Sequence, residues 1–184
     1  MNNQSKVWAS ISLVSMILLL AILAREYDIS LTSFFSSSDD SEEQYNSTSQ
    51  PDPISQDCLN HSGLARHDHA TLKIFINGEQ ELIPANIGIM TEICNQQGEE
   101  MHAVHTHDSS GRLHIESNEP IDIPIGVFFD IWGQHFDETG IFEYRVNSTH
   151  ELVMTVGNNT VDSYDDYLLV NTSEVIEIRY QSRE

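Results

Sequence analysis

The chain has 184 residues with 29 acidic and 8 basic side chains, giving a formal net charge of -21. This length predicts one domain, and the charge argues against nucleic acid or an anionic membrane surface as a partner, because phosphates would be repelled. Binding of metal ions remains compatible with this negative charge. Only 39% of the residues are hydrophobic, and one N-terminal run holds a large share of them, so the rest of the chain is predicted to have a small core.

The first predicted element is a transmembrane anchor at residues 7–24, which contain no charge, proline or glycine. Eighteen helical residues rise about 27 Å, close to the roughly 30 Å of a hydrocarbon core. Lys6 precedes the run, whereas Arg25 after it is followed at once by Glu26 and Asp28, so residues 1–6 are predicted to be cytoplasmic and the remainder to lie outside a cell membrane that is crossed once. A cleaved signal peptide is the alternative, but bulky Ile22 stands two residues before the end of its only plausible cleavage site, Ala24.

Residues 25–56 are predicted to form an acidic, serine-rich stalk, because this composition buries too little apolar surface to offset the entropy of ordering. Asn-x-Ser/Thr triplets occur six times in the chain, and five follow the predicted anchor. Outside the cell the asparagines of these five are candidate glycosylation acceptors: Asn46, Asn60, Asn147, Asn158 and Asn171. A polar surface without sugar is the alternative.

Residues 57–184 are predicted to form a mainly β (α+β) domain, a small antiparallel sheet with one short helix. The segments 72–77 and 82–84 flank Asn77-Gly78, which is a strong hairpin signal. A second hairpin is expected from Met101 to Glu116, with its turn at residues 108–111.

Apolar residues between Pro124 and Gly133 predict the helix, with Phe128, Ile131 and Trp132 facing inward. Strands are expected again at three later segments, 152–156, 167–170 and 175–180. The order strand, turn, strand occurs at both 72–84 and 152–164, a weak internal echo of the kind seen in β-grasp-like modules.

The two cysteines, Cys58 and Cys94, both lie on the predicted outer side. An oxidising compartment allows them to form a disulfide, which would stabilise the domain by about 2–4 kcal/mol. Free thiols and thiolate ligation of a metal are the alternatives.

Histidines are concentrated between residues 61 and 114, where seven of the nine occur. If residues 108–111 form the turn, His105 lies opposite His114, and His107 shares the face of His105 because alternate residues of a strand point the same way. His67 and His69 form another pair with this spacing. The sequence therefore predicts that these five imidazoles are candidate metal ligands.

Imidazole suits zinc, copper, iron and nickel, and three histidines with an open position are typical of a reactive or exchange site. Met90 and Met101 would add soft donors, which makes copper plausible. Three acids, Asp68, Asp108 and Glu116, are candidates to accept hydrogen bonds from the ligands and fix their tautomers.

Residues 105–117 read His-Thr-His-Asp-Ser-Ser-Gly-Arg-Leu-His-Ile-Glu-Ser. This string resembles a motif, His-Thr-His-Asp-x-Ser-Gly-x-x-His-x-Glu-Ser, of uncharacterised secreted or membrane-anchored archaeal and bacterial proteins. The surroundings resemble that group as well. There the motif follows a His-x-His strand and a segment like Pro84–Gly88, and it precedes a helix like Phe128–Gly133. The resemblance covers about 70 residues, and it implies a shared domain without an activity.

Three functional interpretations follow. The first is a membrane-anchored extracytoplasmic domain that binds copper or zinc for sequestration, delivery or sensing. The second is a non-enzymatic, glycosylated surface domain whose histidines are structural, and the third is a metal-dependent enzyme with Glu116 as base. A cupin is disfavoured because Glu116 lies nine residues past His107, too far for the usual motif. Neither a Gly-x-Ser-x-Gly turn nor a glycine-rich phosphate loop is present, so a non-enzymatic role is expected.

Overall fold

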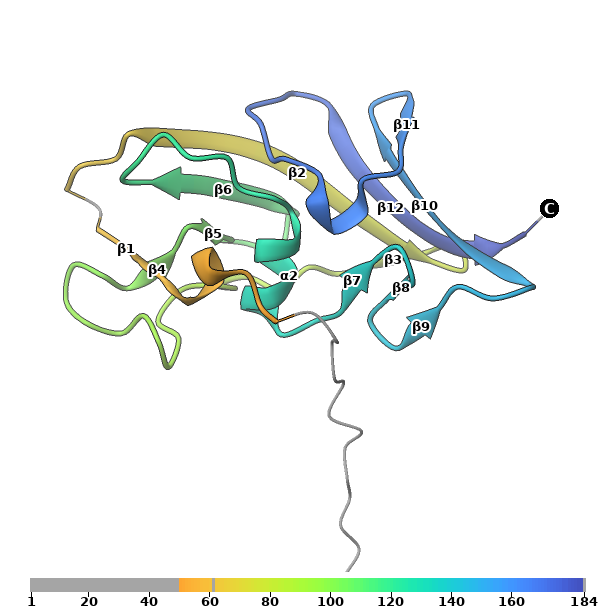
Figure 1. The fold of residues 1–184 in the computed structure, drawn as a ribbon, viewed down its shortest axis with the longest axis horizontal. Coiled ribbons are helices and arrows are strands. Elements are labelled where there is room, and N and C mark those ends of the chain that lie inside the picture. Colours follow the sequence, from red (N-terminus) through yellow and green to blue (C-terminus); the bar gives the residue numbers. More distant parts are fainter. Residues whose placement is uncertain (1–49, 61, 184) are drawn as a thin grey trace, which may run out of the picture. The chain divides into compact units, whose positions relative to one another are not determined.

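A twisted sheet of seven strands organises the described part of the chain, residues 50–60 and 62–183 of a computed structural model (Figure 1). The predicted anchor at 7–24 and the sequon at Asn46 lie outside these residues. Within the described ranges, no helix has both the length and the apolar character needed to cross a membrane. All described residues belong to one unit, Tyr45–Glu184.

The main sheet is mixed. Its strands in spatial order are β11 (Asn159–Val161), β10 (His150–Val156), β12 (Val175–Ser182), β2 (Arg66–Ile76), β6 (Arg112–Ser117) and β5 (Val104–His105), while β3 (Glu79–Glu81) pairs with the end of β2. Every pair is antiparallel except β2 with β12, where Leu72 faces Ile176 in a parallel register. The expected β domain with antiparallel strands is therefore confirmed, and the central parallel pair is an addition that local strand patterns could not show.

The remaining elements are short and flank this sheet. Two are 3-10 helices, η2 (Pro53–Gln56) and η3 (Tyr164–Asp166). Two strands, β1 (Cys58–Leu59) and β4 (Met101–His102), pair with each other. A small sheet is formed by β7 (Phe136–Asp137), β8 (Gly140–Ile141) and β9 (Tyr144–Arg145).

The first hairpin has the predicted turn but a different returning strand. Asn77 and Gly78 both have positive φ, 51° and 90°, as a two-residue turn matched to the strand twist requires. Because such a turn pairs its flanking residues directly, Ile76 faces Glu79. The returning strand is thus Glu79–Glu81 and not 82–84, and Ile83 goes to the core.

The single α-helix of the described residues, α2 (Gly126–Trp132), lies where the sequence predicts it. It ends at Gly133, whose N–H donates to the carbonyls of Asp130 and Phe129. Phe128 is buried as expected, but Ile131 and Trp132 are only half-buried, whereas Val127 and Phe129 are buried. The inward face is rotated because the helix packs against several elements, including η2, β5 and η3.

The segment 167–170 is not the strand that its apolar residues predict. It forms only an isolated bridge between Leu168 and Pro124, and the Leu169 N–H donates to the carbonyl of Ile123. Leu169 is buried while Leu168 and Val170 are half exposed, so this stretch closes one side of the core without entering the main sheet.

Side-chain alternation along β2 separates two faces of the sheet. Ala70, Leu72, Ile74 and Ile76 are buried and share one core with Phe128 of α2; we call this the inner face. The odd-numbered side chains of β2, which begin with the two histidines His67 and His69, point to the outer face. The predicted ligands therefore lie on the side of the sheet that does not carry the core.

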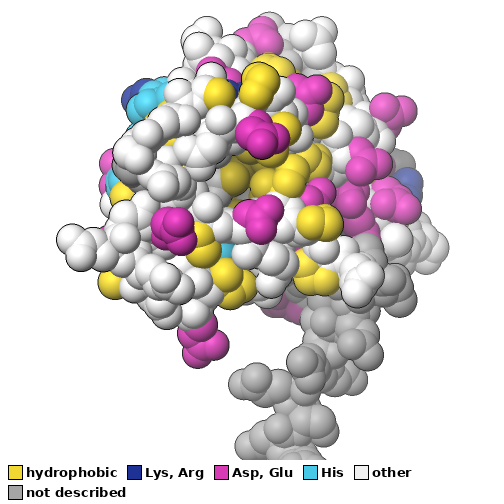
Figure 2. All heavy atoms as spheres, turned by 60° about the vertical axis from the view of Figure 1, so that its left-hand side comes forward, with side chains coloured by type: hydrophobic (Ala, Val, Ile, Leu, Met, Phe, Trp, Pro, Cys, Tyr) yellow, Lys and Arg dark blue, Asp and Glu magenta, His cyan; other side chains and the backbone are white. Residues whose placement is uncertain are grey.

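Acidic side chains are dispersed over the surface, as the composition leads one to expect. Figure 2 shows carboxylates scattered around an apolar patch, with few basic side chains and with histidine at the margin of this face. The negative charge is thus spread as solvated surface.

Candidate metal centre

Three neighbouring strands place three histidines in one row. In the register of β2 with β6, His69 faces His114, and in the register of β5 with β6, His105 faces His114. Directly paired residues of antiparallel strands project to the same face. The predicted hairpin register is confirmed, and His114 lies in the middle of a row that crosses β2, β6 and β5.

Two further histidines flank this row diagonally. His67 precedes His69 by two residues and faces Glu116, while His107 follows His105 by two residues, beyond the end of β5. Because β6 runs antiparallel to both neighbours, these two steps lead to opposite sides of the row. His67 therefore lies beside one end of β6, and His107 lies toward the turn before it.

The five imidazoles form two groups that share His114. One group, the β2 trio, is His67, His69 and His114; the other, the β5 trio, is His105, His107 and His114. In each trio the ligand atoms lie within 4.8 Å of one another. Ring centroids are 4.5 Å apart for His69 and His114, and also for His107 and His114. Each trio could hold a metal ion.

The tautomer of His105 is fixed by the backbone. Its Nδ1 lies 3.0 Å from the carbonyl oxygen of His102. A carbonyl only accepts, so Nδ1 is the protonated nitrogen and the acceptor lone pair of the neutral ring is on Nε2. The His105 side chain is fully buried, which holds this orientation. A hydrogen bond of this kind is what usually positions a metal-binding imidazole.

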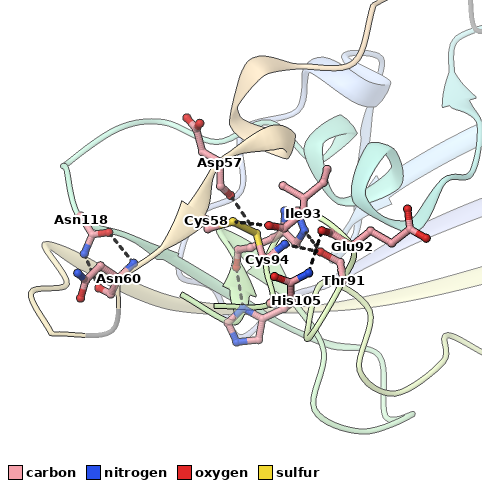
Figure 3. Close-up of a disulfide and its surroundings, with 11 residues drawn as sticks. Asp57, Cys58, Asn60, Thr91, Glu92, Ile93, Cys94, His105 and Asn118 are labelled. Atoms are coloured by element: carbon pink, nitrogen blue, oxygen red, sulfur yellow. Dashed lines mark hydrogen bonds between the residues drawn. A yellow bond between two sulfur atoms is a disulfide. The ribbon is translucent and has the colours of Figure 1, made fainter. Parts of the chain in front are cut away.

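The loop before β4 supports this arrangement through the disulfide. Cys58 and Cys94 are bonded, with Cα atoms 5.4 Å apart, and Figure 3 shows the bond in the neighbourhood of His105. The Cys94 N–H donates to Thr91 Oγ1 at 3.0 Å, and this hydroxyl lies 2.7 Å from His102 Nε2. The disulfide is thereby connected to the residue whose carbonyl orients His105.

Thr91 and His102 were not identified as functional residues by sequence reasoning. In the sequence, the only signal for His102 was its spacing. It lies an odd number of residues from His105 and His107, so on a strand its side chain would point away from theirs. In the structure His102 is buried, and burial lowers its pKa. No local pattern marks Thr91.

Glu116 lies beside the β2 trio. Its Oε1 is 3.3 Å from His67 Nε2 and 3.9 Å from His114 Nδ1, and its side chain is 5% exposed. A buried carboxylate at this position can accept a hydrogen bond from either ring and place negative charge near a bound cation. This geometry agrees with the predicted orienting role.

The other two predicted acids have different contacts. Asp68 accepts a hydrogen bond from Arg66 Nε at 2.6 Å and, by strand alternation, points away from the face of His67 and His69. Asp108 accepts the Ser110 N–H at 2.9 Å within the hairpin turn, and hydrogen bonds from Ser110 lower the pKa of this carboxyl. Among the described residues, neither acid forms a hydrogen bond with a histidine of the trios.

Burial keeps the central imidazole neutral. The pKa of His114 is lowered to about 4, first by burial and then by the neighbouring His107 and His69 and by Arg112. Burial, followed by Arg112, also lowers the pKa of His69. A histidine must be neutral to donate its lone pair to a metal, so at neutral pH the shared ligand is already in the binding form.

The remaining described histidines have separate environments. His135 Nε2 lies 3.2 Å from Asp137 Oδ1, and burial lowers the pKa of this imidazole. The ring of His150 stacks on Tyr180 with centroids 5.1 Å apart. Neither belongs to a trio, so the metal-ligand geometry is specific to five of the histidines that the structure describes.

The four described sequon asparagines, Asn60, Asn147, Asn158 and Asn171, are exposed. Asn60 interacts with Asn118 through two hydrogen bonds (Figure 3). Asn171 lies near the β2 trio, with its Oδ1 3.4 Å from the backbone nitrogen of His69.

Comparison of the chain with protein-family models, with curated proteins and with solved structures finds no match.

Proposed function

We propose that the protein is a membrane-anchored, extracytoplasmic domain that binds a transition metal ion, copper or zinc, for sequestration, delivery or sensing. The observation that carries this proposal is the convergence of four histidines, from β2 and from the end of β5, on His114 of β6. These residues are far apart in the sequence, and only the sheet brings them together.

The donor set supports copper or zinc over the hard cations. Each trio offers three imidazole nitrogens, and calcium and magnesium prefer oxygen ligands. A trio leaves at least one coordination position for water or another molecule, which suits an ion that is exchanged rather than permanently held. The low pKa of His114, about 4, means that binding need not displace a proton from the central ligand at neutral pH.

The extracytoplasmic placement rests on three independent features. The disulfide between Cys58 and Cys94 is typical of oxidising compartments. The four described sequon asparagines are exposed, as acceptors must be, and the apolar run 7–24 is preceded by Lys6, whereas Arg25 after it is followed at once by acidic residues. Protease digestion of intact cells tests it: residues 57–184 should be cleaved while the N-terminus is protected, and the reverse pattern would contradict the proposed orientation.

The fold supports a β-grasp-like assignment of the domain. Two hairpins, β2–β3 and β10–β11, flank α2 in the sequence, and the strand order β3-β2-β12-β10-β11 has its parallel pair at the centre. A β-grasp has this arrangement of two hairpins around a central parallel pair. The hairpin β5–β6 is then an extension beside the first half of β2, and it carries three of the five ligands.

Metal titration of the full chain, purified in a mild detergent, tests the function. We expect copper or zinc to bind, and the His105→Ala/His107→Ala/His114→Ala variant to bind at least about 100-fold more weakly, since even changes beyond the ligands cost 10–100-fold. His150→Ala is the matched control because it removes an imidazole outside both trios. Equal affinity of the triple variant and the unmodified chain would contradict the proposal.

A further inference from the structure

We propose that the two trios are alternative stations for a single metal ion, which remains bound to His114 while it passes between them. This inference rests on the proposed function, because it requires that the cluster binds metal. It adds that the protein binds one ion at a time and transfers it within the molecule.

The ligands form two sites that share one residue, His114. His67 and His69 lie on β2, to one side of His114, while His105 and His107 lie to the other side, on β5 and just beyond it. The ligand atoms are within 4.8 Å of one another inside each trio, and only His114 belongs to both. Among the described residues, no ring contact joins the pair on β2 directly to His105 or His107. The five rings therefore form two three-ligand sites.

The chemistry of imidazole limits the occupancy to one ion. A neutral imidazole has a single acceptor nitrogen, because the other nitrogen carries the proton. For both trios to be filled, the His114 ring would have to lose its N–H and bridge two ions. Two divalent cations on one ring would also repel each other strongly in this partly buried site, where the His114 side chain is 20% exposed.

Each trio has one exposed ligand, His67 or His107, so the stations differ instead in the neighbouring charge and in the burial of a second ligand, which gives the transfer a direction. The His67 side chain is 50% exposed and lies 3.3 Å from the carboxylate of Glu116, so the β2 trio combines an open ligand with a negative charge that attracts a cation. In the β5 trio His105 is fully buried and its tautomer is fixed by the His102 carbonyl. We therefore assign entry to the β2 trio and retention to the β5 trio.

The step itself is a ligand exchange. The ion keeps its bond to His114, the bonds to His67 and His69 break, and bonds to His105 and His107 form. Each imidazole that leaves is replaced by a neutral imidazole, so no proton or electron is transferred.

Cobalt(II) binding to the full chain tests the stoichiometry, because its visible absorption reports the ligand geometry of each site. The variants are His67→Ala/His69→Ala, which retains the β5 trio, His105→Ala/His107→Ala, which retains the β2 trio, and His114→Gln. We expect one ion for the unmodified chain, one for each double variant with distinct spectra, and at least about 100-fold weaker binding for His114→Gln. The unfolding temperature without metal identifies any variant that fails to fold. If replacing buried His105 prevents folding, His107→Ala alone, at an exposed position, serves instead.

Three results would overturn the inference. Two ions on the unmodified chain would show independent or bridged sites, and no binding by one double variant would show that only one trio is a site. After rapid mixing, we expect the spectrum of the β2 trio to convert into that of the β5 trio with the same yield when a chelator is added at the start of the conversion, so a conversion that the chelator intercepts would show release and rebinding. The failure of the proposed function itself is different: the unmodified chain would then bind no better than a variant lacking all five histidines.

Discussion

The two halves of β2 show how one strand can serve two purposes. In its second half, Leu72–Ile76, the inner side chains are buried, and on the outer face the Arg179 guanidinium lies 4.1 Å from the centre of the Phe75 ring. In its first half, Arg66–Thr71, the outer face carries the two histidines of the β2 trio. The backbone continues through both halves and Ala70 of the first half still joins the inner core, but the outer faces differ in chemistry.

This difference means that stability and metal binding should respond to different substitutions. The inner face supplies burial of apolar surface, which is the main favourable contribution to folding. The outer face of the first half holds imidazoles whose removal exposes no core. Substitutions on the two faces should therefore separate folding stability from metal binding, with expected effects that range from several kcal/mol to a few-fold change in affinity.

The largest effect is expected from a substitution on the inner face. Ile74 is fully buried, and Ile74→Ala should lower the free energy of unfolding by about 2–5 kcal/mol because it leaves a cavity. His69→Ala, on the outer face of the same strand, should change it by no more than about 0.5 kcal/mol. Urea unfolding of both variants with a metal chelator present measures the difference. Similar losses in the two variants would show that the trios are part of the stabilising core.

The disulfide is predicted to contribute both to folding stability and to metal binding. Cys58→Ser/Cys94→Ser should lower the free energy of unfolding by about 2–4 kcal/mol, because the bond closes a loop in the unfolded chain. It should also weaken metal binding in a chain that retains only the β5 trio, since Cys94 is connected through Thr91 to His102. A chain that retains only the β2 trio is the control. Equal weakening of both would contradict a specific link to His105.

Asp165, in η3, should make its own contribution to the pH dependence of stability. Burial, with help from Asp166, Asp137 and Glu138, raises the pKa of Asp165 to about 6. At this carboxyl the folded chain binds more protons than the unfolded chain between about pH 4 and 6, so the contribution of Asp165 to stability falls as the pH rises through this window, whereas the lowered pKa of His114 acts in the opposite direction.

Asp165→Asn should therefore stabilise the protein at pH 7 by about 1 kcal/mol, a value reduced for the solvent screening of a half-buried group. At pH 4 the gain should disappear. Denaturant unfolding at both pH values measures it, and Asp162→Asn is the control, because Asp162 is exposed and is not among the charges that raise the pKa of Asp165. A gain that is the same at pH 4 and pH 7 would assign the effect to packing and not to titration.

The smallest predicted effect concerns the charge beside the trios. Arg112 lowers the pKa values of His69 and His114, and among the described residues its guanidinium forms no salt bridge. Arg112→Gln should raise metal affinity about threefold, because it removes a positive charge that opposes a bound cation. Lys73→Gln makes the same change of charge farther along the outer face of β2, and it should have less effect. If both variants change the affinity equally, only the net charge matters.

The hairpin part of the candidate site was predictable from the sequence. A turn at residues 108–111 fixes the register of the two strands that it joins, so the facing of His105 and His114 follows from counting. The turn at Asn77-Gly78 and the helix end at Gly133 have equally local signals. These predictions succeeded because each depends on a few consecutive residues.

The convergence of both histidine pairs on His114 was not predictable, because it depends on the pairing of β2 with β6 across more than 40 residues. Local composition also hid the start of β2, since residues 66–71 are largely polar and the predicted strand began only at residue 72. The pairing of β2 with β12 joins segments about 100 residues apart. Register between distant strands is set by the whole core, which no short window contains.

The edge strand β3 has a consequence for how the molecule behaves at high concentration. It has three residues, Glu79, Gln80 and Glu81, all exposed and none apolar. A strand from another copy that approached this edge would meet carboxylates on a chain of net charge -21, so pairing between copies is opposed by charge before backbone hydrogen bonds can form. At high concentration the copies should therefore remain separate at this edge, and each copy would meet metal ions as an individual molecule.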